Sequence, residues 1–598
     1  MRTKIQTLLI ANRGEIACRI IRSARRLGIK TVAVYSQADR GALHAQLADM
    51  AIALNGFSAA ESYLDAVQLL AAAAESGADA IHPGYGFLSE NAGFAQSVAD
   101  AGLIFVGPDA AAIEAMGSKS HAKQLMTEAG VPLLPGYHGD NQDVDFLHQQ
   151  ADQMNYPVLI KAVAGGGGRG LRIVETSGAF VAALHAVKRE AKSAFADERV
   201  LLEKYLPRAR HVEIQVFADQ HGHCVHLHER DCSVQRRHQK LIEEAPAHGL
   251  HAATRVAMGD AAVRAAQCID YTGAGTVEFL YQDEKFYFLE MNTRLQVEHP
   301  VTEAITGLDL VEWQIRIAQG EKLPLEQSRI KRDGWAIEAR INAEGPAPDF
   351  LPSTGLITRL QWPESNESLR VDAGFRAGDR ISVYYDSLLG KVIAWAPSRE
   401  QAISRLSGAL SALKVKGILH NADFIGAVLD TEAFVKGTVH TAFLQEHEAA
   451  IAAAWEKRQW SASMAGNVNA SDWGAIAGWR SGGLNPFSRQ HHLQALFNGG
   501  EASAASDADT LISQQSGASH QSQIKAPLPG RVIKLFVQPG EAVSKGQPLL
   551  IMEAMKMEHT LRAGTDAVIA ALHCSEQQMV QPDQLLIEFT QSNQADAA

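Results

Sequence analysis

One stretch of the chain has a composition that cannot form a folded core, and it divides the sequence in two. Residues 498–523 are rich in Gly, Ala, Ser, Asp and Gln and carry almost no apolar periodicity. Such a segment is typical of a flexible linker, and as a coil its ends would lie about 28 Å apart. The chain has 598 residues, which at roughly 150 residues per domain predicts about four domains.

The part after the linker contains an internal repeat with an offset of 36 residues. Val532–Ile533 matches Val568–Ile569, and Leu549–Ile551 matches Leu585–Ile587. Two copies of one short-strand unit predict a quasi-symmetric β-sandwich. The hinge between the copies falls near Ala554–Met557.

The start of the chain alternates strand and helix patterns. Thr7–Ile10 is predicted to be a buried strand, Gly14–Leu27 a helix and Thr31–Tyr35 the next strand, and the pattern recurs at Ala80–His82 and Leu103–Phe105. This order indicates a doubly wound βαβ domain. The first turn lacks a GxGxxG motif, so a dinucleotide site is disfavoured.

A glycine-rich loop, Gly165–Gly170, lies between two predicted strands, Tyr156–Lys161 and Leu171–Val174. Glycines let backbone N–H groups approach phosphate oxygens closely. No GK[ST] follows, and a strand comes next, so neither a Walker A loop nor a Rossmann turn fits. The loop is either a flap over a nucleotide or a flexible hairpin tip.

Residues 273–292 are predicted to form a hairpin with a four-residue turn. The expected register places Glu278 opposite Glu290 and Leu280 opposite Phe288. Both faces of the hairpin are largely apolar. Two facing carboxylates in such a half-buried place repel each other unless a cation neutralises them.

Two kinds of cation satisfy that requirement. Oxygen ligands from Glu278 and Glu290, with Asn292 on the same parity, suit Mg²⁺ or Mn²⁺ completed by phosphate and water. Alternatively, an arginine or lysine pairs the two carboxylates.

A dense ionisable stretch, Glu229–Lys240, lies upstream of this hairpin, and the segment Asn292–Pro300 continues directly from it. The second segment would bring Arg294 and Glu298 to the same pocket. An anion-binding arginine beside a carboxylate resembles a general-base arrangement. The alternative for the first segment is a solvated loop of mixed charge.

Lys556 stands between two methionines, Met555 and Met557, at the centre of the C-terminal repeat. Methionines on both sides of a lysine are unusual at the tip of a polar hairpin. They are explained if the lysine is exposed there and covalently modified. A solvated turn lysine is the alternative.

Charge and hydropathy exclude several classes of function. The net charge is −12, so there is no basic excess for nucleic-acid binding. No apolar run approaches the roughly 20 residues of a membrane span. The five scattered cysteines suit a reducing compartment, and the early strand leaves no room for a leader, so we expect a cytoplasmic protein.

Taken together, these segments resemble the biotin-dependent carboxylases. The resemblance rests on His82–Asn91, the glycine loop, Glu229–Lys240, Glu290–Pro300 and the biotinylation signature Ala554–Met557. It implies an α/β and α+β multidomain protein with an all-β tail. The implied domains are a βαβ domain (1–115), an ATP-grasp domain (116–330, with a lid at about 132–204), a biotin carboxylase C-terminal domain (331–447), a short Trp-rich adaptor for subunit docking (448–497), the linker (498–523) and a biotinyl carrier domain (524–591).

The resemblance also implies roles for individual residues. The implied ATP contacts are Lys119, Lys161, Gly167, Gly168, Glu203, Lys204, Leu206, His211, Gln235 and His238. The implied Mg²⁺ or Mn²⁺ ligands are Glu278, Glu290 and Asn292. Lys240, Arg294 and the backbone of Val297 resemble a bicarbonate site with Glu298 as its base, Arg340 resembles the residue that stabilises the biotin enolate, and Lys556 the biotin-bearing lysine.

The implied reaction agrees with elementary chemistry. Bicarbonate is a poor electrophile, so ATP activates it as carboxyphosphate, and phosphoryl transfer needs charge neutralisation and alignment. Glu298 is expected to deprotonate bicarbonate, and Arg340 to offset charge on the ureido oxygen of biotin. A closed glycine flap would keep water from the labile intermediate.

The sequence also indicates which partners to expect. Only roughly 75 residues separate the implied carboxylase from the carrier, which is too few for a domain of the usual size. A separate carboxyltransferase β subunit is therefore implied, in a hetero-oligomer, together with a biotin protein ligase. The first acceptor to expect is 3-methylcrotonyl-CoA, then acetyl- or propionyl-CoA; a subunit of a pyruvate carboxylase and a non-catalytic carrier are the alternatives.

Overall fold

The computed structural model describes residues 4–163, 170–195, 197–236, 239–346, 350–464, 523–555 and 557–590. The chain begins with a five-stranded parallel sheet in the order β3-β2-β1-β4-β5. Its elements are β1 (Thr7–Ile10), α1 (Gly14–Arg26), β2 (Lys30–Tyr35), α2 (Leu43–Leu47), β3 (Met50–Ala53), α3 (Ala66–Ser76), β4 (Ala80–His82), α4 (Ala92–Asp100) and β5 (Ile104–Phe105). The predicted βαβ start is confirmed, and α1 ends just before Gly28, whose positive φ of 72° suits a helix stop.

An eight-stranded antiparallel sheet, in the order β14-β13-β10-β11-β12-β15-β22-β20, forms the centre of the molecule. Its strands are β10 (Arg210–Ala218), β11 (Cys224–Arg236), β12 (Gln239–Ala245), β13 (Gly273–Gln282), β14 (Lys285–Asn292), β15 (Trp335–Asn342), β20 (Leu369–Ala373) and β22 (Leu388–Ala396). Among the helices packed on it are α9 (Ala252–Gln267), α10 (His299–Thr306) and α12 (Arg399–Ala412). Because β12 pairs with β15, the segments predicted as ATP-grasp and C-terminal domains contribute adjacent strands to one sheet.

Further elements surround this sheet. They are α5 (Ala110–Gly117), α6 (Lys119–Glu128), α11 (Leu310–Ala318), β16 (Glu344–Gly345), β17 (Leu351–Pro352), β18 (Gly355–Leu356), β19 (Arg359–Gln361), β21 (Arg380–Ile381), β23 (Lys414–Lys416), α13 (Ala422–Leu429), α14 (Glu432–Val435) and α15 (Phe443–Glu446). None of the helices in the described ranges combines the length and the hydropathy that crossing a bilayer requires.

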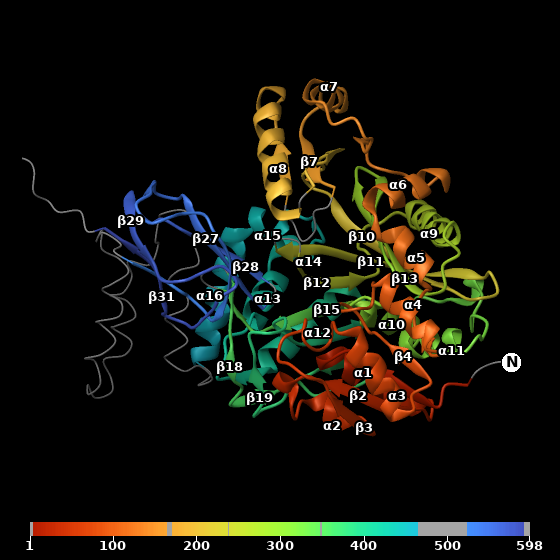
Figure 1. Ribbon diagram of the computed structural model, residues 1–598. Helices are drawn as coiled ribbons and strands as arrows, with labels where there is room; N and C mark the ends of the chain where they lie inside the picture. The colour runs from red at the N-terminus through yellow and green to blue at the C-terminus, as the bar shows by residue number, and fades with distance from the viewer. Residues whose placement is uncertain are drawn as a thin grey trace, which may run out of the picture.

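A small subdomain with its own core stands out from the body, as Figure 1 shows. Its sheet has the order β6-β9-β7-β8. Its elements are β6 (Gly136–Tyr137), α7 (Val144–Met154), β7 (Val158–Ala162), β8 (Leu171–Val174), α8 (Phe180–Phe195) and β9 (Val200–Lys204). The two strands that flank the glycine loop are therefore confirmed. Residues 164–169, with Gly167 and Gly168, lie outside the described residues.

The hairpin of β13 and β14 places Glu278 opposite Glu290, as predicted. The predicted pairing of Leu280 with Phe288 is wrong, because an irregularity after Glu278 shifts the register by one residue. Leu280 instead lies opposite Tyr287. The turn has two residues rather than four, and both have positive φ, 52° and 62°, as in a type I′ turn.

The C-terminal domain of the chain is a sandwich of two four-stranded sheets, β28-β27-β25-β30 and β24-β31-β29-β26. Its strands are β24 (Gln523–Lys525), β25 (Gly530–Leu535), β26 (Ala542–Val543), β27 (Pro548–Ala554), β28 (Met557–Arg562), β29 (Ala567–Leu572), β30 (Met579–Val580) and β31 (Leu585–Phe589). Equivalent strands of the two copies pair in the same way, β25 with β27 and β29 with β31, and each sheet is completed by two strands of the other copy. The predicted quasi-symmetric sandwich is confirmed.

The segment predicted as an adaptor begins with a helix, α16 (Glu448–Met464), that packs on α13. Trp455 is only 7% exposed and belongs to the core around β15, β22 and α13. Its ring meets Phe424 edge-on at 6.2 Å. This part of the segment therefore packs with the carboxylase core. Residues 465–522 lie outside the described residues. They hold the rest of the predicted adaptor and all of the predicted linker except Gln523.

We expect Trp455→Ala to destabilise the body of the protein by about 3–5 kcal/mol, because it leaves a cavity between α13 and α16. The matched control is Trp460→Ala on the same helix, where the side chain is 47% exposed and loss of the ring should cost far less. Urea unfolding followed by circular dichroism compares them. Equal effects of the two substitutions would show that α16 does not depend on this contact.

Candidate functional site

Lys240 on β12 is the centre of the candidate site. Its Nζ lies 2.7 Å from Glu213 Oε2, 2.9 Å from Glu278 Oε1 and 2.6 Å from Glu298 Oε1. Burial alone would lower the pKa of Lys240, but the three carboxylates raise it well above its ordinary value. One ammonium group therefore joins β10, β13 and the start of α10 to β12.

Glu298 lies at the N-terminus of α10, is fully buried, and faces two cations. Its Oε1 accepts a hydrogen bond from Lys240, and its Oε2 accepts one from Arg340 Nη2 at 2.7 Å. Burial opposes the charge, yet Lys240 and Arg340 hold the pKa of Glu298 well below its ordinary value. The side chain is thus a carboxylate, and it becomes a stronger base when either cation turns toward another anion.

Arg340 on β15 bridges Glu298 and a second buried carboxylate, Glu243 on β12. Its Nε donates to Glu243 Oε1 at 2.5 Å. Glu243 lies opposite Glu338 in the register, and both are fully buried. Burial raises the pKa of Glu243 to about 7 and raises the pKa of Glu338 well above its usual range. Both carboxyl groups of the pair are therefore easier to protonate than exposed glutamates.

The predicted metal ligands meet at the β13–β14 hairpin, in different surroundings. Glu278 is buried and accepts hydrogen bonds from Lys240, from Asn292 Nδ2 at 2.9 Å and from Gln296 Nε2 at 3.1 Å. Glu290 is exposed. A lysine partner, the alternative to a metal, is thus present for Glu278, while the carboxylate and amide oxygens of the three predicted ligands are the donors that Mg²⁺ or Mn²⁺ takes.

His211 on β10 lies beside this hairpin. Its Nε2 is 2.8 Å from Glu278 Oε2. Burial favours the neutral ring, but Glu278 raises the pKa of His211 above its ordinary value. Among the described residues, His211, Glu213 and Glu278 also form a group whose ligand atoms lie within 4.8 Å of one another.

Arg294 follows β14 and links the site to the N-terminal domain. Its Nε donates to Glu90 Oε2 and its Nη2 to Asn292 Oδ1, both at 2.8 Å. Glu90 belongs to the His82–Asn91 motif, whose place in the site the sequence did not specify. Val297 lies in the same segment, and its carbonyl accepts a hydrogen bond from the buried Lys391 at 2.7 Å.

The described residues that were predicted to contact ATP lie on β7 and β9 of the small subdomain, just after β9, and on β10 and β11 of the central sheet. Glu203, the last residue but one of β9, is buried and pairs with Lys161 on β7 and with Lys123 on α6. Lys204 Nζ donates to the carbonyl of Asn155 at 2.8 Å. Leu206 is half-buried just beyond β9, and Gln235 lies opposite Lys240 in the register. The Lys119 side chain, Gly167, Gly168, His238 and Lys556 fall outside what the structure describes.

Some residues of the site were missed by the sequence reasoning. Glu213 and Lys123 were not considered, and Arg230 was only part of the charged stretch Glu229–Lys240. Arg230 is fully buried and donates to Glu213 Oε1 at 2.6 Å and to Gln215 Oε1 at 2.8 Å. The alternation of His211, Glu213 and Gln215 along an otherwise apolar strand was the available signal.

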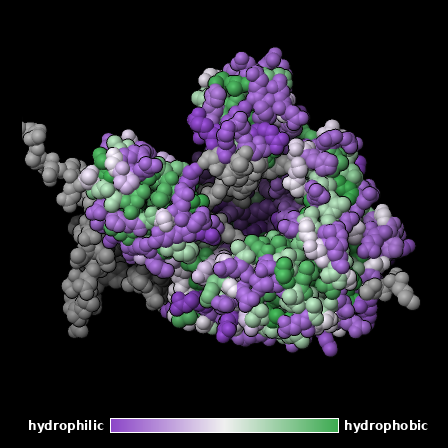
Figure 2. Space-filling view, in the orientation of Figure 1, coloured by the Kyte–Doolittle hydropathy of each residue, from purple (hydrophilic) through white to green (hydrophobic). Residues whose placement is uncertain are grey.

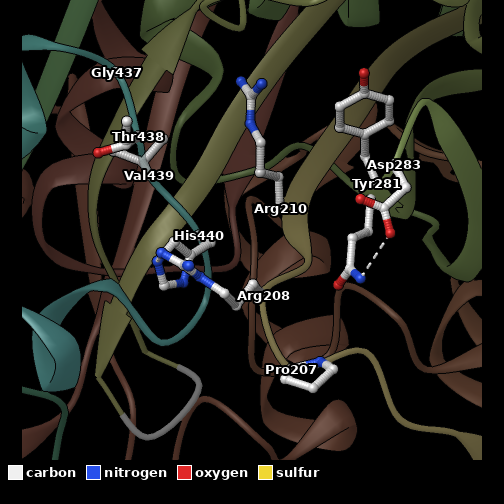
Figure 3. A pocket seen from close by; sticks show the side chains of 10 residues that line it. Pro207, Arg208, Arg210, Tyr281, Asp283, Gly437, Thr438, Val439 and His440 are labelled. Carbon is white, nitrogen blue, oxygen red and sulfur yellow. Dashed lines mark hydrogen bonds between the residues drawn. The ribbon is translucent and has the colours of Figure 1, made fainter.

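The surface is hollowed at this position. Figure 2 shows a hydrophilic recess between the small subdomain and the lower body. On the neighbouring side of β10 lies a pocket of about 470 Å³ lined by Arg208, Arg210, Tyr281 and His440 (Figure 3). Its arginines are paired within the protein, Arg210 with Asp231 at 2.7 Å and Arg208 with Glu446 at 3.0 Å.

Family models match four parts of the chain. They are the biotin carboxylase N-terminal domain (residues 4–113), the carbamoyl-phosphate synthase L chain ATP-binding domain (118–326), the biotin carboxylase C-terminal domain (338–446) and the biotin-requiring enzyme domain (522–589). Two relatives match nearly the whole chain. The methylcrotonoyl-CoA carboxylase subunit alpha of Dictyostelium discoideum is 42% identical over 97% of this chain and 95% of that protein, and the propionyl-CoA carboxylase alpha chain of Ruegeria pomeroyi is 38% identical over 97% and 99%.

Solved structures match the part before the linker. A biotin carboxylase complex from Campylobacter jejuni has a TM-score of 0.71 at 43% identity, covering 74% of this chain and 99% of that one. The biotin carboxylase domain of the 2-oxoglutarate carboxylase from Hydrogenobacter thermophilus, solved with MgADP, ADP and bicarbonate, also has a TM-score of 0.71, at 44% identity over 75% and 99%. The resemblance inferred from the sequence and the predicted fold class are confirmed.

We expect Glu213→Gln to destabilise the protein by about 3–5 kcal/mol, because it leaves the fully buried Arg230 and the partly buried Lys240 short of a counter-charge. The matched control is Glu338→Gln, another fully buried glutamate of the same sheet. Burial raises the pKa of Glu338 well above its ordinary value, so less charge is lost with this carboxyl group and stability should fall much less than in Glu213→Gln. Thermal unfolding at pH 7 compares the two. Equal losses would contradict this assignment of charge.

Proposed function

The chain belongs to the family of biotin-dependent carboxylases, as a biotin carboxylase that carries its own biotinyl domain, and we propose that it is the α subunit of a methylcrotonoyl-CoA carboxylase. The activity of such a chain is the ATP- and bicarbonate-dependent carboxylation of biotin on its carrier domain. Full-length similarity to methylcrotonoyl-CoA carboxylase α subunits from several organisms is the observation that carries the choice of acceptor.

Lys240, Arg294 and the backbone of Val297 are proposed to bind bicarbonate, and Glu298 to take its proton. The charges around Lys240 support this. Lys240 forms ion pairs with three carboxylates. A bound anion would draw the Lys240 ammonium group away from Glu298. The pKa of Glu298 would then rise toward the range of a general base at the moment when its proton acceptor is needed.

Glu278, Glu290 and Asn292 are proposed to hold a Mg²⁺ or Mn²⁺ ion, which would neutralise the phosphate oxygens during phosphoryl transfer. The all-oxygen donor set supports this. The hydrogen bond from Lys240 to Glu278 already supplies one positive charge at that carboxylate. With the metal ion at Glu278, Lys240 could pass from this carboxylate to the substrate without leaving it uncompensated.

ATP is proposed to lie between the small subdomain and the central sheet. Lys119, Lys161, His211, Gln235 and His238 would contact it, with residues 203–206 at the adenine and Gly167 and Gly168 over the phosphates. The buried pairing of Lys161 with Glu203 supports a preformed arrangement there. Closure of the small subdomain would exclude water during transfer.

Lys556 is proposed to be the biotinylated residue, modified by a biotin protein ligase, and Arg340 to contact the ureido oxygen of biotin. Arg340 is held by Glu243 at Nε and by Glu298 at Nη2. These two hydrogen bonds fix the orientation of the Arg340 side chain. Its positive charge can still attract the ureido oxygen of biotin. A carboxyltransferase β subunit, which completes the transfer to the acyl-CoA, is the proposed partner; relatives that match nearly the full length are themselves named as α subunits.

We expect Glu298→Gln to lower bicarbonate-dependent ATP hydrolysis, measured with free biotin, by about 10²–10⁴-fold, the usual contribution of a general base. Lys556→Arg is the control. It should keep the hydrolysis stimulated by free biotin and lose only the labelling of the chain itself with ¹⁴C-bicarbonate. If Glu298→Gln retains full activity, Glu298 is not the base.

The acceptor is tested on the complex isolated from its source with its partner subunit bound. We expect ¹⁴C-bicarbonate to be fixed faster with 3-methylcrotonoyl-CoA than with propionyl-CoA or acetyl-CoA at equal concentration. Preference for propionyl-CoA, acetyl-CoA or pyruvate would overturn the proposed acceptor and leave the biotin carboxylase activity in place.

A further inference from the structure

Met555 occupies the tip of the hairpin formed by β27 and β28, where Ala554 pairs with Met557. A side chain at the tip of a small domain is expected to be exposed, but Met555 is only 3% exposed. Its backbone has a φ of 51°, which non-glycine residues adopt rarely. Something outside the hairpin therefore covers this methionine.

The cover comes from the carboxylase part of the chain. Met555 does not belong to the hydrophobic core of the carrier, which includes Met552 and Leu586. It belongs to the core cluster of the C-terminal carboxylase domain, with Phe350 and Phe424. Within the described ranges, it is the only carrier residue in that cluster. Figure 1 shows the carrier strands next to α13 and α16, in agreement with this contact.

Little else joins the two domains in the described part of the chain. No strand of the carrier packs extensively on a described helix or strand of the carboxylase. A weak electrostatic contact exists at a second place. Hydrogen bonds from Ser58 hold the pKa of Glu61 below its ordinary value, and the guanidinium of Arg531 on β25 adds to this effect. Both side chains are exposed, so that attraction is screened by salt.

We propose that Met555 is the docking residue through which the carrier domain engages its own carboxylase. The inference rests on the proposed role of Lys556, the next residue, as the biotin-bearing lysine. Met555 packs into the hydrophobic core cluster of the C-terminal carboxylase domain. This contact fixes the position of the hairpin tip relative to the site around Lys240. The occupant of this surface is thus a segment of the same chain.

Methionine suits a contact that must form and release. Its unbranched, polarizable side chain fills irregular apolar gaps and adapts to more than one surface. A carrier that serves the carboxylase and a transfer partner in turn needs a dock at each that is selective but not stable. A single buried side chain, with the linker keeping the carrier at high effective concentration, meets both conditions.

The test compares the full chain with Met555→Ser and with Met579→Ser. Met579 is a second methionine of the carrier, on β30, and is 45% exposed. For each protein, the biotin content is measured by a streptavidin shift, and the transfer of ¹⁴C from bicarbonate to the chain is followed in a single turnover and normalised to that content. ATP hydrolysis stimulated by free biotin is measured in parallel.

We expect Met555→Ser to slow transfer to the chain about tenfold and to leave the reaction with free biotin unchanged. Met579→Ser should leave both rates unchanged. The inference is overturned if Met555→Ser transfers at the parental rate, or if both variants slow transfer equally. If the parent shows no hydrolysis stimulated by free biotin, the proposed function itself fails, and this outcome is distinct from a loss confined to transfer.

Discussion

The ion cluster around Lys240 is the constraint on which the central sheet depends. Burying a carboxylate without a counter-charge is costly, and here carboxylates from β10, β13 and the start of α10 are buried within hydrogen-bond distance of one ammonium group. Arg230 and Arg340 supply the further positive charge. The strand order of the sheet therefore brings the buried carboxylates next to the lysine and arginine side chains that compensate their charge.

The same charges make the site reactive. Each cation that stabilises the fold in the absence of substrates is a cation that a substrate anion can recruit, so binding and activation of Glu298 are parts of one exchange of partners. Burial acts in the opposite direction on a carboxyl group without a hydrogen-bond partner. Glu338 has neither oxygen hydrogen-bonded in the described structure, and burial raises its pKa well above the ordinary value. Glu298, whose pKa is lowered, and Glu338, whose pKa is raised, thus both act on Arg340.

The sequence predicted the parts whose patterns are local. The βαβ start, the repeat of the carrier and the facing pair Glu278 and Glu290 depend on period and spacing within one segment. For Glu213, the alternation of polar residues on β10 was a local signal, but its partners Lys240 and Arg230, like the role of Glu243, follow from the order of β10, β11, β12 and β15 in the sheet. The bulge after Glu278 and the packing of Trp455 on α13 also depend on contacts distant in sequence. Motif resemblance supplied the identity of the site, and geometry supplied its charge balance.

The central claim is that Lys240 exchanges carboxylates for substrate. A crystal structure of the full chain with Mg²⁺, ADP and bicarbonate tests it directly. The account predicts the metal ion at Glu278 and Glu290, bicarbonate in contact with Lys240 and Arg294, and Lys240 Nζ beyond ~4 Å from Glu278 Oε1, past the limit of an ion pair. A structure in which Lys240 keeps all three carboxylates while bicarbonate and metal bind elsewhere would contradict it.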